Sequence, residues 1–138
     1  MKWLAVLFVC GLIGCAPPDA IVTPLTDVAG DAVRGAEIFA TRDGGHCVLC
    51  HQVKGLEVEF QGNVGPDLTT VGSRLTDAQL RLRIVDYDIV KPGTTMPSYY
   101  RQRGLEQVEA KYRGQTVLSA QDIEDIITYL SAQTGASD

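Results

Sequence analysis

Two thiols and an imidazole stand within five residues of one another, in the stretch Cys47-Val48-Leu49-Cys50-His51. Two Cys three residues apart fall on one helical turn, so both can reach the two vinyl groups of one porphyrin. The imidazole of His51 then approaches the iron from the same side. The pattern predicts one covalently bound haem c, with Cys47 and Cys50 as thioether anchors and His51 as an axial ligand.

Two other uses of these residues are possible on chemical grounds. Zinc takes four nitrogen or sulfur ligands, and the one soft donor nearby is His46. Its position directly before Cys47 gives poor tetrahedral geometry. A redox-active thiol pair belongs in a βαβ context, and no such pattern surrounds Cys47 and Cys50. Haem attachment is therefore the favoured interpretation.

An iron that transfers electrons needs a sixth ligand, and a thioether raises the reduction potential relative to a second imidazole. The chain has two Met. Met1 would leave with an N-terminal signal, so Met96 is the candidate. It directly precedes Pro97, which fixes the backbone on that side. Three other side chains remain as alternative donors: His46, Lys54 and Lys91.

The stretch Gly65-Pro66-Asp67-Leu68 lies between the two proposed ligands. A ligating imidazole normally donates its second ring N–H to an acceptor, which fixes its tautomer and raises its basicity. The carbonyl oxygen of Pro66 is the candidate acceptor for His51. An ordinary Gly-Pro turn would give the same local sequence.

Three helices are expected to position these groups. Asp31 can cap a helix over residues 32–41, in which Gly35 and Phe39 share one face. Thr76 opens a capping box with Gln79, before a second helix. Its apolar stripe consists of Leu75, Ala78, Leu82, Val85 and Ile89, although residues 80–84 alternate like a strand. The capping box and the longer stripe favour a helix.

Ser119 is expected to cap a last helix with Ile123, Ile126, Ile127 and Leu130 on one face. Tyr129 can reach the first helix at Gly35, where the missing side chain permits a close crossing. The opposite face carries Asp122, Glu124 and Asp125 and is interpreted as a solvated surface.

The first residues read as a signal. Met1 and Lys2 are followed by about a dozen apolar residues, a run too short to span a bilayer of ~30 Å comfortably. Leu12-Ile13-Gly14-Cys15 resembles the lipobox of bacterial lipoproteins, so we expect residues 1–14 to be a signal peptide and Cys15 to be acylated. Ordinary signal cleavage is the alternative. Residues 15–30 are rich in Pro and predict a tether, and residues 31–138 form the domain.

Composition sets the remaining bounds. A chain of 138 residues fits one domain, and four Cys are too few for a disulfide scaffold. A net charge of −5 argues against nonspecific nucleic-acid binding. Residues 74–113 nevertheless hold eight Lys and Arg against five Asp and Glu. This basic stretch includes Met96, so it could steer an acidic partner or pair with the haem propionates.

These residues together resemble the class I cytochromes c across residues 31–138. The resemblance rests on Gly35 and Phe39, the Cys-x-x-Cys-His motif, Gly65-Pro66, Met96-Pro97 and Tyr129. It implies an all-α class I cytochrome c fold, a single domain of about three to five helices wrapped around one haem. By motif position it also implies His51 and Met96 as the axial ligands.

A finer resemblance is to the SoxX family, the monohaem subunits of the SoxAX cytochromes of bacterial sulfur oxidation. The stretches that carry it are residues 50–53, 60–68, 71–75, 80–86, 96–100 and 118–121. The resemblance implies a non-catalytic electron-transfer subunit of an L-cysteine S-thiosulfotransferase complex. Its partners would be a SoxA-like cytochrome subunit, the SoxYZ carrier and a downstream electron acceptor, in the periplasm.

A lipobox departs from the soluble periplasmic members of that family, so a membrane tether through Cys15 is an additional expectation. Two other functions stay open from the sequence. One is a free-standing electron shuttle to an oxidase or another periplasmic redox enzyme. The other is a haem sensor in which a gas displaces Met96.

Overall fold

The computed structural model describes residues 19–42 and 44–135. Within these ranges the elements are, in chain order, α1 (Ala32–Ala40), η1 (Cys47–Leu49), η2 (Val71–Ser73), α2 (Asp77–Asp86), η3 (Tyr87–Ile89), η4 (Ala110–Tyr112) and α3 (Ala120–Ser131). The η elements are short 3-10 helices. The described ranges contain no strand, so the all-α prediction is confirmed.

Local capping starts each α-helix where the sequence predicts. The carboxylate of Asp31 accepts two backbone N–H groups in the first turn of α1. Thr76 and Gln79 form a capping box at α2, and Ser119 and Asp122 form another at α3. These side chains satisfy backbone N–H groups that have no partner within the helix. Each helix start is therefore encoded locally, by a capping side chain that bonds a backbone group no more than three residues away.

α2 is helical as predicted, but it is shorter than its apolar stripe. The helix ends at Asp86, and Ile89 lies in η3 with 42% of its surface exposed. Leu80, Leu82 and Ile84 are all buried, which accounts for the strand-like alternation seen in the sequence. The predicted helix is confirmed, whereas the prediction that its apolar stripe continues to Ile89 is wrong.

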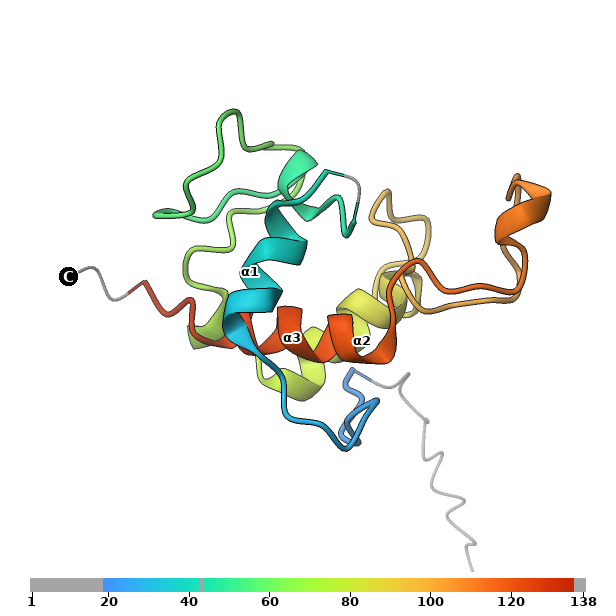
Figure 1. Ribbon diagram of the computed structural model, residues 1–138, viewed down its shortest axis with the longest axis horizontal. Helices are drawn as coiled ribbons and strands as arrows, with labels where there is room; N and C mark the ends of the chain where they lie inside the picture. The colour runs from blue at the N-terminus through green and yellow to red at the C-terminus, as the bar shows by residue number, and fades with distance from the viewer. Residues whose placement is uncertain (1–18, 43, 136–138) are drawn as a thin grey trace, which may run out of the picture.

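α1 crosses α3 closely, as Figure 1 shows. A Cβ atom on Gly35 would overlap the carbonyl of Asp125 and lie 2.9 Å from the Cβ of Tyr129. Phe39 and Tyr129 continue the contact with ring centroids 5.7 Å apart. The predicted crossing of Tyr129 at Gly35 is therefore confirmed, and the missing side chain is what permits it.

The core joins these helices to the loops around them. Its buried members come from α1, α2, α3 and the segments between them: Phe39, Val48, Val53, Val71, Leu80, Ile84, Tyr99, Leu118, Ile123, Ile126, Ile127, Tyr129 and Leu130. Met96 and Cys47 are partly buried and pack against this cluster. The two candidate chemical segments thus border one core.

Residues 19–30, the described part of the expected tether, lie across α2 and α3. The N–H of Ile21 donates to the carbonyl of Ala78 at 2.9 Å, and the N–H of Leu25 donates to Glu124 at 2.9 Å. The side chain of Gln121 also reaches the carbonyl of Ala29. This part of the segment is therefore fixed to the domain. Residues 1–18, with the expected signal and Cys15, lie outside the described residues.

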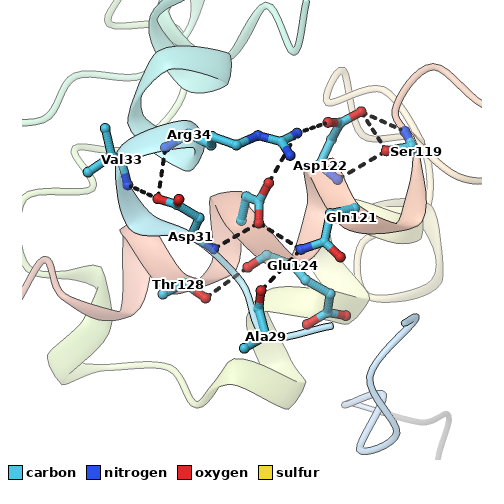
Figure 2. A network of polar contacts seen from close by, with 10 residues as sticks. Ala29, Asp31, Val33, Arg34, Ser119, Gln121, Asp122, Glu124 and Thr128 are labelled. Carbon is cyan, nitrogen blue, oxygen red and sulfur yellow. Dashed lines mark hydrogen bonds and ion pairs between the residues drawn. The ribbon is translucent and has the colours of Figure 1, made fainter. Parts of the chain in front are cut away.

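Two of the three carboxylates on the acidic face of α3 are buried rather than solvated, so the expectation is wrong for Glu124 and Asp125, whereas Asp122 is partly exposed. Glu124 is 6% exposed and Asp125 is fully buried. Glu124 receives two hydrogen bonds from Arg81 of α2, at 2.7 and 2.8 Å. Asp125 accepts the backbone N–H of Asp31 at 2.8 Å and lies 3.3 Å from Arg34. Figure 2 shows Arg34 at the start of α1 reaching Asp122 of α3 in the same network. The contacts with Arg81 compensate the burial of Glu124, whereas Oδ2 of Asp125 has the ion pair with Arg34 but no hydrogen bond within the described residues.

Candidate haem-binding site

The two thiols and His51 sit on one tight turn. η1 begins at Cys47, and the N–H groups of Cys50 and His51 both donate to the carbonyl of Cys47, at 3.1 and 2.9 Å. Both thiols are free of disulfide bonds and only partly buried. The turn thereby presents Cys47, Cys50 and His51 from one short piece of backbone, as haem attachment requires.

The ring of His51 is oriented by its contact with Pro66. Nδ1 lies 2.8 Å from the carbonyl oxygen of Pro66. Because that oxygen can only accept, Nδ1 is the donor and Nε2 is left as the lone-pair nitrogen. The predicted hydrogen bond is present in the structure, and it leaves a nitrogen suited to an iron.

Gly65 makes room for the same ring. A Cβ atom at this position would overlap the Cε1 atom of His51 and lie 2.6 Å from Nδ1. The backbone N–H of Gly65 also donates to the carbonyl of Cys50 at 2.7 Å. Gly65 and Pro66 therefore fix the ring from one side, and no larger residue than Gly fits at position 65.

Sequence reasoning missed the contribution of Gln61. Its side-chain oxygen Oε1 accepts the backbone N–H of Val53 at 2.7 Å, and its side-chain Nε2 donates to the backbone carbonyl of Leu56 at 2.8 Å. The N–H of Gly62 donates to Val48 at 2.8 Å, directly behind the thiol turn. Gln61 closes the loop that follows His51, and a lone polar residue in a loop gives no sequence signal for this role.

The loop that carries Met96 is fastened by residues that follow it. The hydroxyl of Ser98 donates to Asp86 at 2.6 Å, and the N–H of Tyr99 donates to the carbonyl of Ile84 at 3.2 Å. The N–H of Met96 itself bonds to the hydroxyl of Thr94 at 3.2 Å. Met96 is partly buried against the core, and its anchors lie at the C-terminal end of α2.

Tyr99, three residues after Met96, belongs to the buried cluster against which both Cys47 and Met96 pack. Burial raises the pKa of Tyr99, and the charges of Cys47 and Cys50 raise it further. Burial likewise raises the pKa of the Cys47 thiol to about 12. Such a thiol is not ionised at neutral pH, so it is a poor redox nucleophile.

The alternative interpretations find little support in the described residues. Within ranges 19–42 and 44–135, no three His, Cys, Asp or Glu side chains gather as a metal-binding cluster. His46, Lys54 and Lys91, the alternative sixth ligands, are all exposed, whereas Met96 is partly buried. A hollow of about 710 Å³ lies between the N-terminal segment and α2, but neither Cys nor His lines it.

The donor set fits a covalently attached haem. It consists of two free thiols on one turn, an imidazole with a free Nε2, and a partly buried thioether. The cytochrome c family model matches residues 32–134, which include this whole set.

The chain belongs to the cytochrome c family. This cytochrome binds one haem c covalently and has the class I cytochrome c fold, so the predicted fold and cofactor are confirmed. When bound, haem supplies a ferric–ferrous couple that takes up and releases one electron, so the protein acts in electron transfer.

Solved structures refine this assignment. A chain of SoxXA from P. pantotrophus is 33% identical, with a TM-score of 0.77 over 84% of this chain and 90% of that one. The cytochrome is therefore a SoxX-like member of class I. The c-type cytochrome SorU from Sinorhizobium meliloti is 22% identical with a TM-score of 0.50, covering 75% of this chain and 91% of that one, and shares the fold. No curated protein matches the sequence.

No helix within residues 19–42 and 44–135 is long and apolar enough to cross a membrane.

Proposed function

We propose that this cytochrome is the electron-transfer subunit of a SoxAX-type complex. The observation that carries the proposal is its 33% identity to a chain of SoxXA across 90% of that chain. In such a complex the thiolate of a SoxYZ carrier Cys bonds to the terminal sulfur of thiosulfate, and two electrons are released. Because one haem takes one electron at a time, the chain passes these electrons on in two single transfers to a downstream acceptor.

In this proposal Cys47 and Cys50 hold the haem through thioethers, and His51 and Met96 are the axial ligands. Pro66 sets the tautomer of His51 through its carbonyl oxygen. The chain itself does no sulfur chemistry, because thioether formation consumes both thiols of the domain. The sulfur chemistry belongs to a SoxA-like partner, so this subunit is non-catalytic within the L-cysteine S-thiosulfotransferase complex.

The periplasm is the compartment that this role requires. We propose that residues 1–14 are a signal peptide, that Cys15 carries a lipid anchor, and that residues 31–138 are the cytochrome domain. The proposal draws on the lipobox-like stretch Leu12-Ile13-Gly14-Cys15. A single acyl chain anchors only marginally, whereas several chains on one Cys anchor stably.

Affinity purification with haem staining tests the role. The tagged cytochrome, expressed together with its native operon, should recover a second c-type cytochrome in equal amount, and the complex should be reduced by thiosulfate in the presence of the carrier. Recovery of the cytochrome alone, with transfer of electrons to an oxidase, would instead identify a free-standing shuttle. A visible spectrum of the reduced protein that changes on addition of carbon monoxide would identify a sensor in which the gas displaces Met96.

A further inference from the structure

Residues 102–117, called the arm below, project from the body of the molecule between the Met96 loop and α3 (Figure 1). None of the sixteen is buried, and all but Val108 and Thr116 are exposed. The N–H of Val117 joins the base of the arm to Tyr99 at 3.0 Å. Bonds farther out stay within the arm, such as Tyr112 to Glu109. The arm adds nothing to the core, although ordering it costs conformational entropy.

The root of the arm is fixed beside the Met96 loop. The guanidinium of Arg101 lies 3.3 Å from Asp86 and 3.6 Å from Asp88, at the end of α2. The same Asp86 accepts the hydroxyl of Ser98, two residues after Met96. The arm therefore starts from a rigid base that it shares with the proposed sixth ligand.

The arm has the chemistry of a binding surface. Leu105, Tyr112 and Val117 expose 37%, 54% and 60% of their surfaces. Lys111 pairs with Glu109 at 3.3 Å, whereas neither Arg103 nor Arg113 pairs with a carboxylate within the described residues. Exposed aromatic and Arg side chains on a common surface are typical of interfaces and of their energetic hot spots.

Two hollows on the arm are each lined by arginine. One of about 310 Å³ lies between its two legs and is lined by Leu105, Val108 and Arg113 among others. The other, of about 450 Å³, lies at the root and is lined by Tyr100, Arg101, Gln102 and Arg103. The arm carries three Lys and Arg against two Glu, a net charge of +1, in a chain whose net charge is −5.

We propose that the arm is the docking element for the haem-bearing partner subunit, and that it binds an acidic surface with an apolar centre on that partner. Carboxylates of the partner pair with Arg103 and Arg113, and apolar side chains cover Leu105 and Tyr112. This inference rests on the proposed function. Docking there would bring the partner close to the Met96 loop, because the arm and that loop are both anchored at Asp86.

Charge reversal on the arm tests the docking. The variant Arg103→Glu/Arg113→Glu changes two exposed side chains, and Arg42→Glu/Lys54→Glu is a control with the same charge change near the thiol turn. The arm variant should bind the partner about tenfold or more weakly, with loss of the salt dependence of association, while the control binds as wild type does. Tyr112→Ala should weaken binding without changing the salt dependence.

A second variant separates docking from folding. Replacing residues 102–117 with a short Gly-Ser linker should abolish partner binding and leave the visible spectrum and the potential of the isolated cytochrome unchanged. If the Arg103→Glu/Arg113→Glu variant or the linker variant binds the partner as the wild type does, the inference is overturned while the proposed function stays intact. A shifted potential with intact partner binding would place the arginines at the haem propionates and would also overturn it.

Two further outcomes identify a different occupant. A wild-type cytochrome that self-associates by mass measurement, with the arm variant monomeric, would make the occupant a second copy. A wild-type cytochrome that recovers no second cytochrome would contradict the proposed function, and with it this inference. Each outcome is distinguishable because the wild type, the control and the arm variants are measured in parallel.

Discussion

Residues 47–68 form a loop whose hydrogen bonds lie mostly within the loop itself. Residues 91–100 are instead held to α2, mainly through hydrogen bonds of the residues that follow Met96. On the first side, Gly65 and Pro66 hold the ring of His51 by contact and by a 2.8 Å hydrogen bond. On the second side, Met96 has one local bond, to Thr94, and its loop depends on Ser98 meeting Asp86.

Because the two sides are held differently, a substitution on one side should damage the fold and a substitution on the other should damage ligation. A change beside His51 disturbs a close-packed turn, so it should damage the fold. A change at the Asp86 anchor leaves the core intact and loosens a loop, so it should damage ligation alone. Electron transfer needs little rearrangement around the iron, and we expect the closely packed His51 side to supply most of that rigidity.

The largest effect is expected from Gly65→Ala. The added methyl group would overlap the imidazole of His51, and either the ring or the backbone must move. We expect the free energy of unfolding to fall by about 1–3 kcal/mol, together with a lower yield of covalent haem. Denaturant unfolding and haem staining on a denaturing gel measure the two effects.

Gly44→Ala is the matched control, since the nearest atoms to its Cβ would be 3.8 Å away, at ordinary contact distance. It should leave both the yield and the stability close to those of the wild type. Equal stability of the two variants would remove the claim that the His51 side is tightly packed.

Asp86→Asn should have a smaller effect, confined to the Met96 side. The neutral amide loses the ion pair with the guanidinium of Arg101 and keeps only an uncharged hydrogen bond with Ser98, so the anchor weakens by about 0.5–1.5 kcal/mol. Imidazole added to the ferric protein should then displace Met96 more easily, with affinity raised about tenfold for each 1.4 kcal/mol lost. Spectral titration with imidazole measures this affinity.

Asp27→Asn removes one exposed charge elsewhere and controls for the change in net charge. Ser98→Ala should raise the imidazole affinity in the same direction but by less, because it removes the Ser98 hydrogen bond and leaves the ion pair between Asp86 and Arg101. The double variant should show less than the sum of the two effects, because they share the contact between Ser98 and Asp86. An imidazole affinity equal to that of the wild type in both variants would show that the anchor does not hold Met96.

The smallest effect concerns Asp67, which follows Pro66 on the His51 side. Hydrogen bonds from Thr69, and then from Gln52, lower the pKa of this exposed carboxylate below its ordinary value. Its contribution to stability is therefore present above pH ~3.9 and is lost as the pH falls through the lower pKa of the folded state. Asp67→Asn should be slightly less stable than the wild type at neutral pH.

The difference in stability between Asp67→Asn and the wild type should shrink below pH ~4, which acid unfolding followed by the haem absorbance measures. A difference that grows as the pH falls would reverse the sign and would contradict the assigned role of Asp67.

Much of the fold could be predicted because its signals are local. Asp31, Thr76 and Ser119 cap helices through backbone groups two or three residues away, and the sequence shows each cap directly. The burial of Glu124 could not be predicted in the same way. Its partner Arg81 is 43 residues distant, and an acidic face with no visible partner is ordinarily solvated.

The residues of the candidate site likewise differ in whether local sequence or only the folded chain reveals them. His51, Pro66 and Met96 follow from motif spacing, whereas Gln61 and Asp86 act through contacts that only the folded chain creates. Asp86 did carry a signal, because a carboxylate in the last turn of a helix opposes the helix dipole and needs a compensating partner. The arm gave no periodic pattern, since it packs on nothing in the chain itself.

His51 and Met96 are the proposed axial ligands, one held by packing and the other by a loop. The visible spectrum and the potential of ferric Met96→Ala test this assignment most directly. The weak sulfur-to-iron charge-transfer band should disappear and the potential should fall, while covalent haem and the fold remain. A variant that keeps the band and the potential of the wild type would show that another donor occupies the sixth position.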